Sequence, residues 1–299
     1  MLTAEQSILE SKSSVFGNHR LHCLELLLHV PHQLKLGSAA VQIVLRTADV
    51  EVAMEGDSTV LHAINDAHPG VRVSCTLASS FYQFTGDAAW KNLYERLMQQ
   101  NQMDDNTFFL IAAPLPDRVM LPEPELNRFF PVTGQMGILR QGADLKTRLH
   151  LCSGKICNTH FDADRGSIIV EAGGYTICPD CGVANYCESE LKHLHDAQAH
   201  SLLCPVNLGG IKADQGQYEE GGRILYSREE GTFVEFASDD TAAWSDGVYQ
   251  HVSRRVTSPI AELTVLEDTF RLSTADYVDF QLNSFGQWKI SGNTATFTH

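Results

Sequence analysis

"CPDCGVANYC", residues 178–187, places three cysteines within ten residues of a 299-residue chain. Six of the eight cysteines lie between positions 152 and 204, whereas Cys23 and Cys75 lie alone in apolar runs and are expected in the core. Disulfides of a secreted protein would not gather in one segment. In a reducing compartment, clustered cysteines with interleaved histidines indicate metal binding. The segment therefore predicts that zinc–thiolate bonds organise the middle of the chain.

Two cysteine pairs supply the first candidate ligands. Zn²⁺ takes four ligands in a tetrahedron, and a Cys-x-x-Cys pair supplies two thiolates from one tight turn. Cys178 and Cys181 form such a pair, and Gly182 after it allows the turn to close. Cys152 and Cys157, in "CSGKIC", form a looser pair with Ser-Gly in the turn.

The segment after Cys187, "ESELKHLHDAQAHSLLC", predicts a helix over residues 188–203 with leucines on its apolar side. His200 and Cys204 are four residues apart, so on a helix they project from one face and can share an ion. His193 would lie only about 20° round the helix from His200, whereas His195 would point more than about 100° away. His193 is therefore preferred to His195 as a ligand.

The candidate ligands number eight, as two tetrahedral sites require: Cys152, Cys157, Cys178, Cys181, Cys187, His193, His200 and Cys204. With "CPDC", "NYC" and a closing "HSLLC", the segment resembles a MYND-type zinc finger. The resemblance covers about 55 of the 299 residues. It implies two cross-braced structural zinc ions, one held by Cys152, Cys157, Cys187 and His193, the other by Cys178, Cys181, His200 and Cys204.

The segment departs from the MYND pattern in three places. The first cysteine pair has four intervening residues rather than two, and the stretch between the pairs, 158–177, is long and contains a strand-like "GSIIVEAGG". The position of the sixth ligand, four residues after Cys187, holds Leu191. An alternative is a zinc ribbon built from the two cysteine pairs, with the remaining Cys and His residues idle or in a second site.

Around this module the sequence predicts an α+β protein in which a zinc-stabilised finger separates a mixed α/β domain from a small antiparallel β region. The α/β domain shows strand patterns at 20–30, 39–54, 71–78 and 106–115, and helix patterns at 58–67 and 87–100. The expected parts are an N-terminal arm (1–18), the mixed α/β domain (19–120), a Pro-rich linker (121–147), the MYND-like finger (148–206) and a β-rich C-terminal region (207–299).

Charge and hydropathy narrow the function classes. The formal net charge of −15 makes nucleic acid an unlikely partner, because phosphate neutralisation needs Lys and Arg. Apolar runs stay under about 12 residues, too short for a membrane span. The N-terminus lacks the pattern of a signal or mitochondrial presequence, so a cytoplasmic or nuclear protein is expected. The sequence does not exclude an organelle or a large assembly as the location, because membership of an assembly requires no targeting signal.

The favoured function is a noncatalytic zinc-binding protein that acts as an interaction or structural subunit of a larger assembly. The thiolate-rich zinc sites look closed, whereas a catalytic zinc keeps an open position. The MYND resemblance implies a protein partner, such as a proline-rich or extended peptide. One alternative is an enzyme with its site in the N-terminal α/β domain, where Asp49, Glu51, Glu55 and Asp57 form no recognisable motif. Another is a nucleic-acid-binding zinc finger.

Overall fold

The structure is a computed structural model of the 299-residue chain, which divides into two compact units, Met1–His62 with Gly70–Pro124 and Ala63–Pro69 with Glu125–His299. The residues that the structure describes are 75, 78–79, 82, 88–99, 127–130, 135–141, 145–154, 162–182, 193–207, 209, 213–216, 221–244, 248–273 and 277–298.

In the first unit the main described element is helix α5 (Ala88–Gln99), at the position where the sequence predicts a helix over 87–100. Trp90, Leu93 and Leu97 recur at helical spacing, and all three side chains are buried. Cys75 is buried and helical, so the strand predicted over 71–78 is wrong at this residue. The arm and the other predicted elements of this unit lie outside the described residues, as does Cys23. No described helix is long and apolar enough to cross a membrane.

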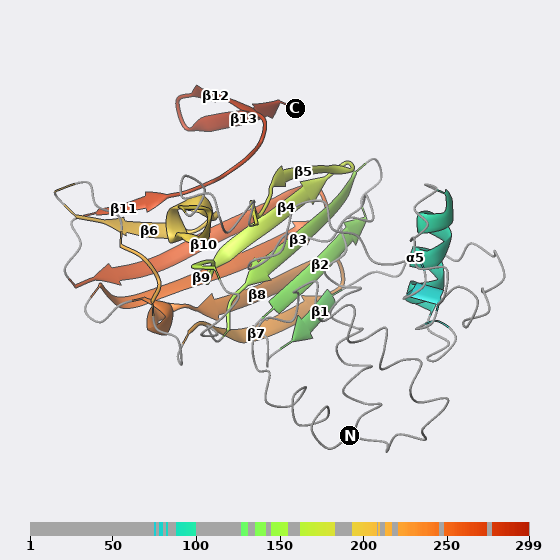
Figure 1. The fold of residues 1–299 in the computed structure, drawn as a ribbon, viewed down its shortest axis with the longest axis horizontal. Helices are drawn as coiled ribbons and strands as arrows, with labels where there is room; N and C mark the ends of the chain where they lie inside the picture. Colours follow the sequence, from blue (N-terminus) through green and yellow to red (C-terminus); the bar gives the residue numbers. More distant parts are fainter. Residues whose placement is uncertain are drawn as a thin grey trace, which may run out of the picture. The chain divides into compact units, whose positions relative to one another are not determined.

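The second unit begins with a five-stranded antiparallel sheet in the order β1-β2-β3-β4-β5 (Figure 1). Strands β4 and β5 are joined by the two-residue turn Gly173–Gly174, in which both residues have positive φ, as such hairpin turns require. The strands are β1 (Asn127–Phe130), β2 (Gln135–Gln141), β3 (Lys146–Cys152), β4 (Ser167–Ala172) and β5 (Tyr175–Cys178).

A second antiparallel sheet has four strands in the order β10-β9-β8-β7. Strand β6 (Leu203–Val206) pairs with β11 (Tyr277–Phe280), and β12 (Gln287–Ser291) forms a hairpin with β13 (Thr294–Thr298). Short 3₁₀ turns, η2 (Ala197–Ala199) and η3 (Thr241–Ala243), precede β6 and β9. The strands of the four-stranded sheet are β7 (Arg223–Glu230), β8 (Phe233–Asp239), β9 (Tyr249–Ile260) and β10 (Leu263–Leu272).

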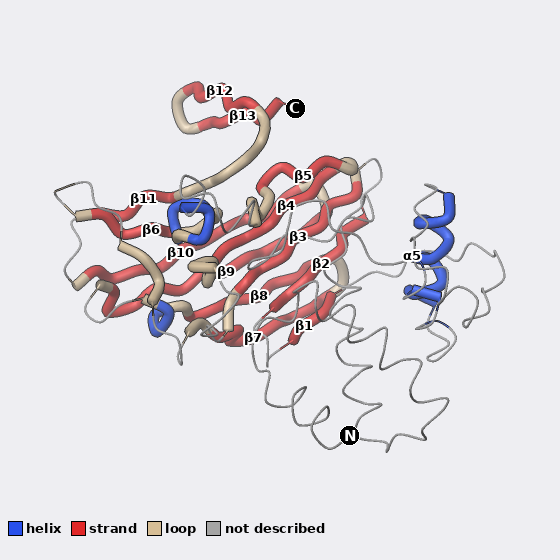
Figure 2. Tube along the Cα trace, viewed as in Figure 1, coloured by secondary structure: helices blue, strands red, loops and turns tan. Residues whose placement is uncertain are grey.

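The two large sheets face each other as a β-sandwich (Figures 1 and 2). Strand β9 shows how the sequence produces this packing, because Val252, Arg254, Val256 and Ser258 are buried and alternate with residues that are more exposed. An apolar centre fills the middle of the sandwich and joins β2, β3 and β4 to β8 and β9. Its members are Ile138, Leu149, Leu151, Ile168, Val234, Phe236 and Val256.

The α+β prediction is wrong for the second unit, whose described elements are antiparallel strands and short 3₁₀ turns. Strands β1 and β2 and the start of β3 lie within the predicted linker, and the rest of β3 together with β4 and β5 lies within the predicted finger. The small antiparallel sheet expected in the tail is in fact one layer of the sandwich. The strand-like "GSIIVEAGG" forms β4 and its hairpin turn, because its apolar residues pack against the facing sheet.

The predicted helix over 188–203 is also wrong in its described part. Residues 193–195 and 197–199 form 3₁₀ turns, His200 has an extended backbone, and β6 begins at Leu203. Backbone groups of this segment close short turns, as where Ala199 N donates to Asp196 O (2.9 Å), and they also bond to the chain around the start of β4. Ala163 N donates to His195 O (2.9 Å), and Ile168 N to Ser201 O (3.3 Å). The argument that His200 and Cys204 share one helix face therefore fails.

Candidate functional site

Buried polar residues gather where β3 and β8 end, on the segments 152–154, 162–166, 178–182, 193–202 and 239–244 and at Arg254 of β9; we call this region the polar end. The turn "DADRG" (162–166), which leads into β4, lies at its middle. Asp162 and Asp164 are fully buried. Gln215 holds the turn like a short strand partner, because its side chain accepts from Arg165 N (2.9 Å) and donates to Arg165 O (2.7 Å). The turn is therefore fixed on both sides.

Asp162 pairs with His195, whose Nδ1 lies against Asp162 Oδ1. Burial raises the pKa of Asp162 to about 6, although the hydrogen bond with His195 lowers it. The Asp162 side chain is fully buried, whereas that of His195 is 28% exposed. A carboxylate on Nδ1 selects the tautomer that carries its proton there and its lone pair on Nε2. The pair thus presents an oriented imidazole near the surface.

His200 lies in the same region, fully buried beside Asp180, with 3.4 Å between Nδ1 and Asp180 Oδ2. Gly182 N donates to Asp180 Oδ1 (2.9 Å) and so fixes the carboxylate. Burial lowers the pKa of His200, but the nearby carboxylates of Asp180, Asp162 and Asp164 outweigh it and raise the pKa to about 9. His200 is therefore an imidazolium at neutral pH, and it partly offsets the negative charge of the polar end.

The structure places the predicted ligands on separate elements. Cys152 ends β3, where its Sγ donates to Asp164 Oδ2 (3.0 Å) and accepts from Arg165 Nη1 (3.3 Å). Cys204 lies in β6, with its Sγ 3.6 Å from Ala213 O. His193 is exposed. Cys157 and Cys187 lie outside the described residues.

The remaining predicted ligands are Cys178, which ends β5, and Cys181, which follows in the next turn. Burial raises the pKa of both thiols, that of Cys178 to about 12. Among the described residues, no group of three or more His, Cys, Asp or Glu side chains is arranged to hold a metal ion. The described part of the chain therefore gives no support to the zinc-finger interpretation.

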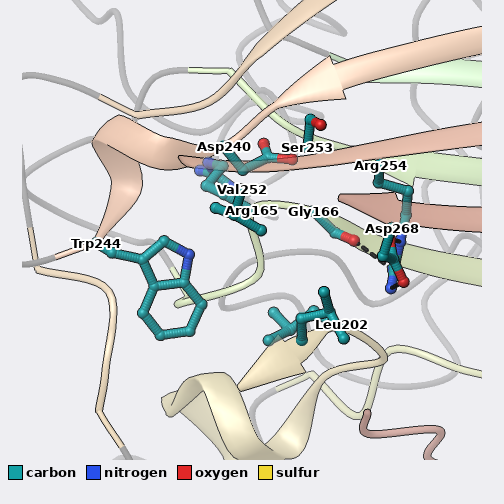
Figure 3. A pocket seen from close by; sticks show the side chains of 10 residues that line it. Arg165, Gly166, Leu202, Asp240, Trp244, Val252, Ser253, Arg254 and Asp268 are labelled. Atoms are coloured by element: carbon teal, nitrogen blue, oxygen red, sulfur yellow. Dashed lines mark hydrogen bonds and ion pairs between the residues drawn. The ribbon is translucent and has the colours of Figure 1, made fainter. Parts of the chain in front are cut away.

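A small cavity lies within the polar end, between Arg165, Asp240, Trp244 and Arg254 (Figure 3). Its volume of about 10 Å³ suits at most a single water molecule. Asp240 is buried beside it and accepts hydrogen bonds from Ser153 and Ser238, both at 2.6 Å. This cavity is therefore too small for an organic ligand.

No family model matches the sequence, and no curated protein matches it either. Solved structures with a similar fold are found. One heparinase III crystal structure has a TM-score of 0.64 and 15% identity, over 90% of this chain and 42% of that chain. A heparinase III with methylated lysines has a TM-score of 0.67 and 11% identity, over 96% and 43%. A mutant of the heparan sulfate lyase HepC from Pedobacter heparinus has a TM-score of 0.62 and 11% identity, over 90% and 41%.

These similarities define the class of fold, that of the heparinase III structures, and the chain spans about two fifths of their length. Together with the missing metal cluster among the described residues, they overturn the expectation of a noncatalytic zinc-binding subunit. The enzyme alternative agrees better with them. Its predicted location in the N-terminal domain does not match the polar end, which lies in the second unit.

Sequence reasoning missed Asp162, Asp164 and Asp180, and it considered His195 only as a zinc ligand, because the cysteines were interpreted first. A usable signal was present: "DADRG" places two aspartates and an arginine between two strand-like runs, "KTRLHLC" and "SIIVEA". Charged residues at the junction of two buried strands are expensive to bury, so they mark a candidate functional site.

Proposed function

We propose that this chain is a polysaccharide lyase, or the part of one that contains its β-sandwich, and that it cleaves a uronate-containing glycan. Two observations support the proposal. The fold is similar to those of heparinase III and heparan sulfate lyase structures along most of this chain. The polar end also presents an imidazole that a buried carboxylate orients. The Asp162–His195 pair is the observation that carries the proposal, because fold alone does not determine function.

The proposed reaction is a β-elimination. A base removes the proton on C5 of the uronate, next to the carboxylate, and the electron pair forms a C4–C5 double bond. The C4–O bond to the neighbouring sugar breaks, and the leaving oxygen takes up a proton. No water, oxidant or reductant is consumed, so the atoms and electrons balance.

Each residue of the polar end has a role that follows from its position. His195, with its lone pair on Nε2, accepts the C5 proton, because its side chain reaches the surface. Asp162 fixes the imidazole and stabilises the imidazolium that forms. His200 is fully buried, so it does not contact the substrate; its positive charge instead limits the repulsion between the carboxylates of the site and an acidic glycan.

The first test uses the masses of the products. The purified protein is incubated with a panel of uronate-containing glycans, and the fragments are weighed. Elimination predicts new ends that are lighter by one water than the corresponding hydrolysis products. Fragments with the mass of hydrolysis products, or no cleavage of any uronate glycan in the panel, would contradict the proposal.

The second test uses a matched pair of histidines from one short segment. His195→Gln removes the proposed base, and we expect kcat/KM to fall by a factor of about 100 or more, the usual contribution of a general base. His193→Gln, two residues away and exposed, should leave kcat/KM unchanged. Equal activity of the two variants would remove His195 from the mechanism.

A further inference from the structure

Arg254, on the inner face of β9, contacts several parts of the polar end at once. Its side chain is 3% exposed. Nε and Nη2 donate to the two carboxylate oxygens of Asp268 on β10, at 2.7 and 2.9 Å. Nη1 donates to two main-chain carbonyl oxygens, those of Gly166 (2.6 Å) and Ser201 (2.9 Å). Figure 3 shows the guanidinium between Asp268 and Gly166.

The two carbonyl groups belong to the two segments that carry the candidate site. Gly166 ends the "DADRG" turn, which holds Asp162 and Asp164, and Ser201 directly follows His200. Ser201 O also accepts from Ile168 N (3.3 Å), so the two segments already touch beside the arginine. One side chain from the facing sheet therefore ties the turn that carries Asp162 to the segment that carries His195 and His200.

The chemistry of the contact requires arginine. A guanidinium has donors in a fixed planar fork, so it can bind a carboxylate with two N–H groups and still donate to two carbonyls from the remaining side. A lysine ammonium has the charge but not this geometry. The ring of Phe280, on β11, lies 5.6 Å from the guanidinium carbon and covers another side. Burying such a charge is costly, and a well-packed apolar pair often does as well for stability alone.

We propose that Arg254 is a positioning residue of the candidate active site, which sets the spacing between the Asp162 turn and the His195–His200 segment. The catalytic effect of Arg254 rests on the proposed lyase function. The four hydrogen bonds by which Arg254 holds the two segments together, which we call the clamp, do not depend on that function. Asp268 supports the clamp by fixing the plane of the guanidinium.

Arg255 provides a matched control on the same strand. It follows Arg254 directly, so its side chain lies on the opposite face of the sheet. It also pairs with an acidic residue of β10, Glu267, and lies 3.7 Å from Glu235 of β8. It therefore has the charge, the strand and the type of ion pair of Arg254, but its partners Glu267 and Glu235 lie outside the polar end.

The experiment compares Arg254→Lys with Arg255→Lys in the full chain by amide hydrogen exchange. We expect Arg254→Lys to speed exchange by about tenfold or more at residues 163–168 and 195–202, since a charge-assisted clamp is lost there. Exchange in β8 should stay unchanged, and Arg255→Lys should match the wild type throughout. Unchanged exchange in the two segments, or an equal increase in β8, would overturn the proposal.

Steady-state kinetics distinguish a positioning role from a merely structural one, because only a positioning role predicts a lower kcat at a nearly constant KM. With a cleaved glycan, Arg254→Lys should lower kcat by about tenfold or more while KM stays within about twofold, because misplaced groups slow the chemistry more than binding. A loss confined to KM, or no loss, would contradict the positioning role. If the wild type cleaves no uronate glycan, the proposed function fails while the exchange result still decides the clamp. Should Arg254→Lys not fold, Asp268→Asn tests the same two segments, with a smaller increase in exchange expected.

Discussion

The two halves of one sandwich interior differ sharply in chemistry. The apolar centre joins the two sheets through aliphatic side chains and Phe236, whereas the polar end, a few residues further along the same strands, buries carboxylates, an imidazole and a guanidinium. Strand β9 shows both on its inner face, because Val256 belongs to the centre and Arg254 to the polar end. Burial of apolar groups stabilises a fold, while burial of charges costs stability unless each is paired.

This difference separates the region that stabilises the fold, the apolar centre, from the region that is the candidate functional site, the polar end. The apolar centre alone explains why the two sheets pack. The polar end, with Asp162 Oδ2 and His200 Nε2 lacking a hydrogen-bond partner among the described residues, is less favourable than an apolar filling of the same space. A region that costs stability is a better candidate for function than one that supplies it.

The largest effect is expected in the apolar centre. Phe236→Ala removes a fully buried ring that contacts both sheets, so the free energy of unfolding should fall by about 3–5 kcal/mol. Phe233→Ala, on the same strand and only partly buried, is the control and should cost about 1 kcal/mol. Chemical denaturation measures both. Similar costs for the two variants would mean that the centre described here is not the main source of stability.

A smaller effect, with a defined pH dependence, is expected from Asp240. Burial raises its pKa from 3.8 to about 6, in spite of the hydrogen bonds from Ser153 and Ser238. The folded state then binds the proton more tightly than the unfolded state, so the stability from this group is present below pH 4 and is lost as pH rises through 6. Asp240→Asn should remove this loss, which corresponds to about 2 kcal/mol. Denaturation of both proteins at pH 4 and pH 7 measures it.

Asp239, the preceding residue, supplies a control of opposite sign. Burial raises its pKa, but hydrogen bonds from Thr241 and Arg223 outweigh burial and lower it below 3.8. Its contribution is therefore present above pH 4 and is lost as pH falls through the lowered value. Asp239→Asn should instead reduce the loss of unfolding free energy that occurs as pH falls below 4. If Asp240→Asn left the dependence between pH 4 and pH 7 unchanged, the buried carboxylate would not be the source of that loss.

The sequence predicts the parts of this structure that depend on local pattern. Alternation over residues 223–298 indicates strands where β7, β8, β10 and the last hairpin form, and helical spacing indicates α5. The sequence-based prediction of the fold fails between residues 127 and 206, because it rests on the cysteine spacing and not on the strand pattern of "SIIVEA". Local sequence patterns do not predict the polar end, because its contacts join residues far apart in the chain, such as Ser153 with Asp240 and Gly166 with Arg254. Such contacts follow from how two sheets pack, which one segment does not encode.

The central claim is that the polar end gives up stability for catalysis, and Asp162→Asn tests it most directly. The substitution removes a buried carboxylate whose pKa burial has raised, so the melting temperature should not fall. It also removes the charge that orients His195, so the rate at which the protein forms unsaturated uronate, followed by ultraviolet absorbance, should fall by about 100-fold. A variant that forms the double bond as fast as the wild type, or that melts well below it, would contradict the account.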